Sequence, residues 1–304
     1  MPDSVAQKKL LQGAGRRLQF IDFRLFWDGR FNRADLSETF GISVQQASSD
    51  INEYVKLAPQ NLRYDPQQRA YLRTPEYNPA LLHSAAERYL LQLVAIERHW
   101  MDSNETWFDT IPPIENVEIR RKRTDSLILL KILDAIRGKM QFAMDYASLT
   151  GSTEGHRVIA PHALAHAGGR WYVRAWSCEH NDFRDYSIDR IRSIDALAPS
   201  DVDPALDFEW AHVIDLTVIP NPELPEERRA AVAAEYDMVG GELKLPMRVS
   251  LTFYLMALYN LDVEPGRLSP YKQQLVLSNR EEVIRAREIT RNLAVEALAR
   301  RASQ

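Results

Sequence analysis

Five polar, uncharged side chains lie close together between residues 43 and 52. A glutamine or asparagine amide can form two hydrogen bonds with adenine, and a serine hydroxyl adapts to several bases. On the second helix of a helix-turn-helix, such side chains would meet base edges in the major groove of DNA. The residues with this chemistry are Gln45, Gln46, Ser48, Ser49 and Asn52.

Two short helices joined by a tight turn are predicted to hold these side chains outward. Leu36 and Phe40 are four residues apart on the first helix, and Gly41 can adopt the left-handed backbone that ends it. Ser43 begins the second helix, and Gln46 stands three residues later, as a capping box requires. The predicted buried stripe of the second helix consists of Val44, Ala47, Ile51, Tyr54 and Val55.

Residues 62–72 predict two short strands around a turn that contains Pro66, which is the place and shape of a wing in a winged helix-turn-helix. Arginines here would contact phosphates, which fix the position of a protein on the duplex without reading its sequence. An ordinary helical hairpin with a solvated polar face is the alternative interpretation. Besides the polar side chains of the second helix, the predicted DNA-binding residues are Arg33, Ser43, Arg63 and Arg69, and Arg73 is a further candidate for a phosphate contact.

Charge is unevenly distributed along the 304 residues. Residues 1–75 carry 11 Lys and Arg against 8 Asp and Glu, a net charge of +3, whereas the rest of the chain carries −7 and the whole chain −4. The net negative charge of the rest of the chain argues against a protein that binds nucleic acid over its whole surface. A locally basic N-terminal part fits a protein that contacts DNA with one domain. A dimer would double the basic surface and steepen the salt dependence of binding.

Several classes of protein find no support in the sequence. No apolar run approaches the roughly 20 residues that span a bilayer, and the N-terminus shows no export signal. A single cysteine, Cys178, excludes an internal disulfide framework and a multi-cysteine zinc site. Phosphate-binding loops and the common hydrolase motifs are absent. We therefore expect a cytoplasmic protein with no membrane partner, catalytic residue, cofactor or metal.

The periodicity of the sequence changes along the chain. Residues 1–78 are predicted to form the winged helix-turn-helix, with a first helix over residues 10–27, and residues 79–126 a helical linker with its main helix over 79–101. A further amphipathic helix over 126–138 ends at Gly138. After it the period becomes two residues, which predicts strands over residues 141–149, 155–160, 170–178 and 183–191. Residues 127–200 thus predict a small, strongly curved sheet or barrel.

Residues 201–304 form the C-terminal part, which we expect to contain both helices and strands. Its last helix is predicted from Ser278 or Asn279 to about Arg301. Paired carboxylates at its start favour the helix dipole rather than indicating a catalytic site. We expect its apolar side to pack in the core or in a dimer interface, through Val283, Ala286, Ile289, Leu293 and Ala297.

The segment GGRWYVRAWS is preceded by Ala160-Pro161-His162 and followed by YSIDRI. In this order the motifs resemble the WYL domain, a small Sm-like or SH3-like β-barrel of bacterial transcriptional regulators. The resemblance covers about residues 127–197. Val173 stands where the motif has Leu, a mild departure that keeps the same burial chemistry.

The segment EYDMVGGELKLPMRVSLTFYLMALYNLD, residues 235–262, is similar to the extension that follows this domain in the family. In family members that extension serves dimerisation and ligand gating. The complete order resembles the WYL-domain regulators encoded beside phage-defence systems such as BREX and CBASS, of the BrxR and CapW type. The resemblance implies an α+β multidomain fold with a winged helix-turn-helix, a helical linker, an Sm/SH3-like barrel and an α/β extension. It also implies a homodimeric repressor of a phage-defence operon.

Side chains alternate along the strand over residues 170–178, so Tyr172, Arg174 and Trp176 share one face. Arginine offers a planar fork of donors and aromatic faces stack bases, which predicts an anion or nucleotide platform. The alternative is that Tyr172 and Trp176 are core aromatics and that Arg190 pairs with Asp189 or Asp185. The family resemblance implies an effector pocket, for which we predict Tyr146, Ser148, His162, Tyr172, Arg174, Ser187 and Arg190.

Together these features predict a homodimer on a near-palindromic double-stranded operator, released when a small effector, such as a nucleotide or nucleic-acid fragment, binds the WYL domain. Only an effector that binds two dimer geometries unequally can shift their populations. Two other classes stay open. One is a transcriptional activator of the same architecture, and the other is an accessory factor or enzyme subunit that uses the winged helix only for docking.

Overall fold

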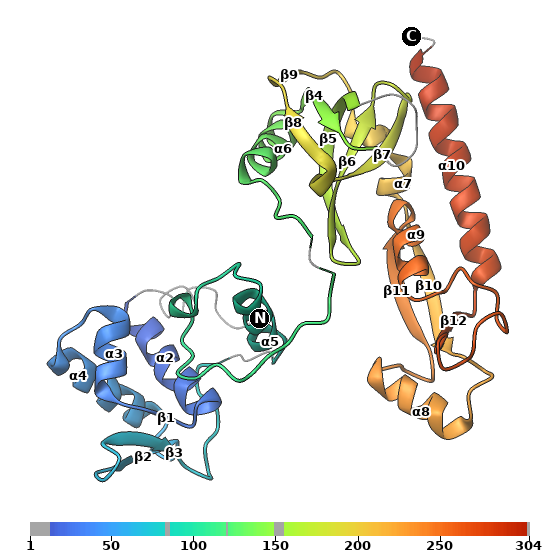
Figure 1. The fold of residues 1–304 in the computed structure, drawn as a ribbon. Coiled ribbons are helices and arrows are strands. Elements are labelled where there is room, and N and C mark those ends of the chain that lie inside the picture. Colours follow the sequence, from blue (N-terminus) through green and yellow to red (C-terminus); the bar gives the residue numbers. More distant parts are fainter. Residues whose placement is uncertain (1–12, 83–85, 120, 149–154, 303–304) are drawn as a thin grey trace. The chain divides into compact units, whose positions relative to one another are not determined.

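The computed structural model describes residues 13–82, 86–119, 121–148 and 155–302. The chain forms two compact units, Met1–Ile119 and Arg120–Gln304 (Figure 1). Within the described residues, no helix is long and apolar enough to cross a membrane.

Unit 1 is a group of helices with a small antiparallel sheet of strand order β1-β3-β2. Residues 62–73 form the predicted hairpin. The predicted first helix ends at Trp27 as expected, and its residues 10–12 lie outside the described part of the chain. The elements are α2 (Ala14–Trp27), β1 (Arg30–Phe31), α3 (Arg33–Phe40), α4 (Val44–Leu57), β2 (Leu62–Asp65), β3 (Ala70–Arg73), α5 (Ala86–Glu97) and η1 (Ser103–Glu105).

Local signals explain where α3 and α4 begin and end. Asn32 and Asp35 form a capping box at the start of α3. Gly41 follows α3 in the left-handed region, with φ 62°, which a side chain would strain. Ser43 caps α4 by accepting a hydrogen bond from the backbone N–H of Gln46. The second half of the predicted capping box is wrong, because the Gln46 side chain does not reach back to residue 43 and binds elsewhere.

Most of the predicted stripe on α4 is buried in the core of unit 1. Ala47, Ile51 and Tyr54 are at most 2% exposed. Val44 is an exception, since 54% of it is exposed, and its predicted burial is wrong. Val44 is the first residue of α4, and the buried stripe begins one turn later, at Ala47. Trp107, in the segment after η1, packs edge-on against Phe20 and closes this core.

The chain after β3 is anchored by a buried carboxylate rather than by a helix. Asp22 of α2 is fully buried and accepts hydrogen bonds from the backbone N–H groups of Ala80, Leu81 and Leu82, at 2.7 to 3.0 Å. The hydroxyl of Tyr77 donates to the same side chain. The predicted helix over 79–101 is therefore shorter: α5 covers Ala86–Glu97, and residues 79–82 are not helical.

The first half of unit 2 is a six-stranded antiparallel sheet covered by one helix. Its strand order is β7-β6-β5-β4-β8, with β9 paired to β4, so the order is open and its edge strands β7 and β8 are not paired with each other among the described residues. Helix α6 packs on the sheet over a core that contains Ile132, Phe142 and Val173. The elements are α6 (Ser126–Gly138), β4 (Met140–Tyr146), β5 (Gly155–Ala167), β6 (Arg170–Ser177), β7 (Asp182–Ser187), η2 (Ile188–Arg190), β8 (Ile191–Ile194) and β9 (Ala198–Pro199).

The second half of unit 2 contains a three-stranded sheet of order β11-β10-β12 and a long last helix. In Figure 1 this helix, α10, runs beside both sheets of the unit, and Leu298 near its end packs against Trp176 and Phe183. Val283 is buried as predicted, but Ile289 and Leu293 are exposed by 54% and 39% and do not face a core. The elements are η3 (Pro204–Leu206), α7 (Phe208–Ala211), β10 (Val213–Pro220), α8 (Glu226–Glu235), β11 (Leu243–Arg248), α9 (Val249–Leu258), β12 (Leu275–Leu277) and α10 (Arg280–Ala302).

Candidate nucleic-acid interface and buried polar cluster

One face of α4 carries exposed polar side chains at helical spacing. Gln45, Ser49 and Asn52 are exposed, and Lys56 continues the row one turn later. Residues four and three apart lie on the same side of a helix. Ala47, Ile51 and Tyr54 hold the opposite side in the core. This row, Gln45, Ser49, Asn52 and Lys56, is called the α4 polar row below.

Two of the five predicted base-reading side chains are engaged within unit 1. The Gln46 amide nitrogen donates to Asp50 Oδ1 at 3.0 Å. Asp50 is buried and forms an ion pair with Arg17 of α2, at 2.7 Å between Nε and Oδ2, which raises the pKa of Arg17. The Ser48 hydroxyl donates to the carbonyl of Val44 at 2.8 Å. These two side chains therefore brace α4, whereas those of the α4 polar row point to solvent.

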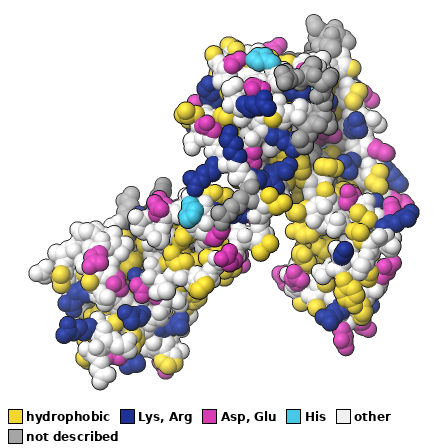
Figure 2. Space-filling model, in the orientation of Figure 1, with side chains coloured by type: hydrophobic (Ala, Val, Ile, Leu, Met, Phe, Trp, Pro, Cys, Tyr) yellow, Lys and Arg dark blue, Asp and Glu magenta, His cyan; other side chains and the backbone are white. Residues whose placement is uncertain are grey.

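Basic side chains lie near the same helices (Figure 2). Arg33, Arg63 and Arg69 are exposed and form no ion pair among the described residues. Arg69 has φ 51° at the turn of the hairpin, where Asp65 accepts hydrogen bonds from two backbone N–H groups. Arg73 is different, because its guanidinium donates to the carbonyl of Phe26 at 2.6 Å and fixes the hairpin to α2.

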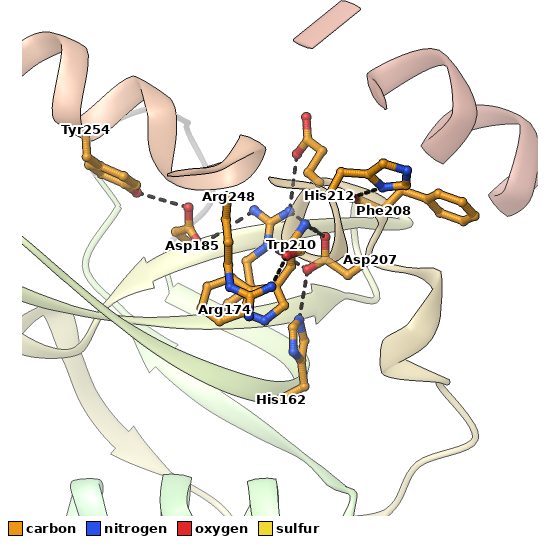
Figure 3. Close-up of polar contacts among 10 residues, drawn as sticks. His162, Arg174, Asp185, Asp207, Phe208, Trp210, His212, Arg248 and Tyr254 are labelled. Atoms are coloured by element: carbon orange, nitrogen blue, oxygen red, sulfur yellow. Dashed lines mark hydrogen bonds and ion pairs between the residues drawn. The ribbon is translucent and has the colours of Figure 1, made fainter. Parts of the chain in front are cut away.

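A second polar cluster lies buried in unit 2, around Arg174 of β6 (Figure 3). Its guanidinium binds Asp207 with two bonds, Nε to Oδ2 at 2.7 Å and Nη2 to Oδ1 at 2.9 Å, and Glu209 at 3.2 Å. Asp185 of β7 is 3.6 Å from Nη1. Burial by itself lowers the pKa of Arg174, but the hydrogen bonds to Asp207 and the surrounding carboxylates outweigh it and raise that pKa.

Asp207 joins the sheet to the short helix α7. Its Oδ2 is 2.8 Å from His162 Nε2 on β5, and its Oδ1 accepts the backbone N–H of Trp210 and so caps α7. Burial raises the pKa of Asp207, yet the bonds from Arg174 and His162 outweigh burial and lower it. One carboxylate therefore holds two strands and one helix together.

At the edge of the cluster, visible in Figure 3, residues of α9 and β11 contact the strand β7 and the helix α7. The hydroxyl of Tyr254 donates to Asp185 at 3.2 Å, and its ring lies 4.7 Å from that of Tyr172. Burial raises the pKa of Asp185 despite its closeness to Arg174. Arg248 lies over the ring of Trp210 at 4.8 Å and donates to its carbonyl.

The predicted effector residues do not line one common surface. Tyr146 and Ser187 lie in the sheet core, where the Tyr146 hydroxyl accepts the backbone N–H of Ser187 at 3.2 Å. His162, Tyr172 and Arg174 lie together on the other face, which α7, α9 and the end of α10 cover. Arg174 is enclosed in this structure, and the anion or nucleotide platform predicted around it stays a prediction. Trp176 is a core aromatic, as the alternative interpretation held.

The remaining two members of that set are half-buried, Ser148 after β4 and Arg190 in η2. The prediction that Arg190 lies on the last strand is wrong, because Ile188–Arg190 is a single helical turn between β7 and β8. Asp185 pairs with Arg174 and not with Arg190 among the described residues. The part that these residues play in effector binding stays a prediction.

Sequence reasoning missed Asp207 and Glu209, which bind Arg174, and also Tyr254 and Arg248, which bind at the edge of the cluster. Asp207 and Glu209 are 33 and 35 residues from Arg174 in the chain, so no local pattern connects them. Tyr254 and Arg248 are farther still. The one available signal was Asp207-Phe208-Glu209-Trp210, an acidic and aromatic run after a loop.

A cavity of about 110 Å³ adjoins the other side of His162, lined by Lys139, Phe183 and Val202 among others. The described residues contain no group of three or more side chains suited to hold a metal ion.

Three domain families match consecutive parts of the chain. The winged helix-turn-helix domain of the BrxR transcriptional regulator matches residues 13–95, the WYL domain matches 128–196, and the C-terminal dimerization domain of BrxR matches 213–283. The sequence-based resemblance is thereby confirmed over each of its three parts.

Full-length relatives agree with this order. The DNA-binding transcriptional repressor CapW of Pseudomonas aeruginosa is 36% identical over 282 residues, which cover 93% of this chain and 94% of that protein. The CapW repressor of Stenotrophomonas maltophilia is also 36% identical, over 92% and 94%, and that of Escherichia coli is 35% identical, over 89% and 91%. Among solved structures, the proteasome accessory factor B/C (PafBC) of Arthrobacter aurescens covers 89% of this chain and 45% of its own length, at 15% identity. Its TM-score of 0.28 is too low to support an argument about the fold. The identities and coverage of the CapW proteins are decisive, and this chain belongs to the CapW family of winged-helix, WYL-domain transcriptional repressors.

Proposed function

We propose that this protein is a homodimeric, sequence-specific DNA-binding repressor of a phage-defence operon. The observation that carries the proposal is the α4 polar row, because Gln45, Ser49 and Asn52 are exposed and are held outward by a buried backing. Contacts to the phosphates beside it are supported by Arg33, Arg63 and Arg69, which are exposed and form no ion pair within the part of the chain that the structure describes. The CapW relatives are named as DNA-binding transcriptional repressors. The protein acts as a regulator rather than as an enzyme.

Two copies would each place the N-terminal half of α4 in a major groove. Because a twofold protein binds a twofold site, the operator is near-palindromic, with half-sites about one helical turn or a multiple of it apart. Specific affinity is expected in the range of roughly 10⁻⁸ to 10⁻¹¹ M at physiological salt.

The C-terminal part supplies the dimer interface in this proposal. Its match to a dimerization domain covers residues 213–283. The same part exposes many large apolar side chains, which in a monomer would face water. They are Val213, Val239, Phe253, Leu258, Tyr259 and Tyr271, together with Ile284, Ile289, Leu293 and Val295 of α10.

The domain limits and the effector belong to the same proposal. We assign residues 1–78 to DNA binding, 79–126 to the linker, 127–200 to effector sensing in an Sm- or SH3-like barrel, and 201–304 to dimerisation. The cavity beside His162 has about 110 Å³, whereas typical ligand pockets have about 300 to 1,000 Å³. A nucleotide-sized effector therefore needs more space than this cavity offers. In this proposal α7 moves off the sheet to provide it, which breaks the bonds of Asp207 to Arg174 and His162. That movement would link effector binding to the C-terminal part.

The proposal is tested by the affinity of the purified protein for the DNA upstream of its own gene, measured by fluorescence anisotropy with a scrambled duplex as control. Gln45→Ala and Asn52→Ala should each weaken specific binding by roughly 30-fold or more, because a homodimer loses one good base contact, worth about 1 to 3 kcal/mol, in each of its two half-sites. Gln46→Ala, whose side chain binds Asp50, should have a smaller effect.

Two other functions make different predictions in the same experiment. An accessory factor that only docks on DNA would bind both duplexes weakly and equally, and the variants would not change its affinity. A transcriptional activator would bind as the repressor does, but adding it to transcription in vitro would raise transcript levels instead of lowering them.

A further inference from the structure

Val44 is a large apolar residue in the first turn of α4, with 54% of its surface exposed. A single exposed apolar residue needs no explanation in general. Its position is what distinguishes it, because it lies between the capping Ser43 and Gln45 of the α4 polar row. The N-terminal residues of a recognition helix are those that contact base edges.

The surroundings of Val44 offer few free polar groups. The Ser48 side chain, one turn later on the helix, directs its hydroxyl to the Val44 carbonyl at 2.8 Å. The Gln46 amide is directed toward Asp50. Gln46 is itself exposed, but its amide nitrogen is engaged by Asp50, and Val44 places its two methyl groups at the surface between the exposed Ser43 and Gln45.

Base chemistry narrows what such a surface can recognise. In the major groove the edges of guanine, adenine and cytosine present hydrogen-bonding groups, whereas thymine adds a C5-methyl group. A valine side chain has no polar atom, so its favourable contact is with that methyl. Valine on a helix is also held in one main rotamer, and little rotational freedom is lost when it binds.

We infer that Val44 is a specificity-determining residue, whose side chain contacts the methyl group of one thymine in each half-site of the operator. The inference rests on the proposed DNA-binding function. It adds that one base pair is recognised by an apolar contact, next to the base read by Gln45.

The test removes only the methyl group, by replacing each operator thymine in turn with deoxyuridine. Burying about one methyl group is worth about a fourfold change in affinity. For the wild-type protein, one position per half-site should therefore show about a fourfold rise in Kd, and substitution in both half-sites about a 15-fold rise. The other thymines should show little change.

The variant Val44→Ala should reduce that penalty to less than about twofold, because its shorter side chain no longer reaches the methyl. Val44→Ser serves as a second variant with a polar group at the same place. Leu57→Ala is the matched control. Leu57 is equally exposed, at 53%, but lies about 20 Å away at the other end of the same helix, so its removal should leave the deoxyuridine penalty unchanged.

The possible outcomes separate this inference from the function on which it rests. Specific binding with no methyl-dependent thymine overturns the role of Val44 and leaves the repressor function standing. A penalty that is equally large in wild type and Val44→Ala also overturns it. Absence of any specific binding by the wild type would instead overturn the proposed function itself. Melting curves of the variants establish that each is folded.

Discussion

The α4 polar row and the Arg174 cluster both consist mainly of polar side chains but lie in opposite environments. Gln45, Ser49 and Asn52 are exposed, whereas Arg174 is 3% exposed and bound by the protein's own carboxylates. Both sets could bind nucleic acid if judged by residue type alone. Only the first is open to a partner. The comparison shows that spatial neighbours decide whether a polar side chain serves binding or holds the fold together.

The largest effect is expected from Arg174→Leu, which removes the partner of buried Asp207 and Asp185. Leaving buried charges uncompensated typically costs about 3 to 5 kcal/mol. The melting temperature of unit 2 should therefore fall by roughly 10 °C, measured by calorimetry on the full chain. Arg192→Leu is the control, because its ion pair with Asp145 is exposed and its loss should cost less than about 1 kcal/mol. An equal fall in melting temperature for Arg174→Leu and Arg192→Leu would contradict the distinction between buried and exposed polar side chains.

A medium effect on stability is expected from Asp28, a largely buried carboxylate of unit 1. It would show that burial, rather than the unit in which a side chain lies, determines how that side chain contributes to stability. Burial raises the pKa of Asp28 to about 6, helped by the charge of Asp109, although Arg24 at 2.7 Å acts in the opposite direction. In the unfolded chain the pKa is about 4. Because the folded value is raised, the stabilising contribution is present below pH 4 and is lost as the pH rises through 6.

Asp28→Asn should remove this loss. Between pH 4 and pH 7 the unfolding free energy of the wild type should fall by roughly 1 to 2 kcal/mol relative to the variant, after allowance for partial solvent screening. Urea unfolding curves at several pH values measure the difference. Parallel pH profiles for the two proteins would show that Asp28 has no raised pKa.

The smallest effect on stability is expected at the exposed surface. Arg63→Ala should change the unfolding free energy by no more than about 0.5 kcal/mol, since Arg63 has no ion pair among the described residues. It should nevertheless reduce the salt dependence of operator binding, by a slope of about 2 for a dimer that loses two phosphate contacts. Arg228→Ala, an exposed position on α8, should leave the slope unchanged. A slope that Arg63→Ala does not alter would remove Arg63 from the phosphate contacts.

Much of the local structure was predictable because its signals lie close together in the chain. Gly41 and Ser43 place the turn between α3 and α4, and the predicted helix over 126–138 matches α6. The errors in the predicted helices and strands lie where contacts with residues distant in the chain decide the local structure. Asp22 holds residues 80–82 out of a helix, and a turn at Ile188–Arg190 interrupts the last predicted strand.

The candidate sites divide in the same way. The sequence by itself determined which residue types stand on α4, and the three-domain order that the family matches confirm. Only the tertiary structure decided that Asp50, the partner of Gln46, is buried and paired with Arg17, that Val44 is exposed, and that Arg174 is enclosed. The reason is physical: capping and helical period act over a few residues, whereas burial and ion pairing depend on groups brought together from 30 or more residues apart, such as Asp207 and Arg174.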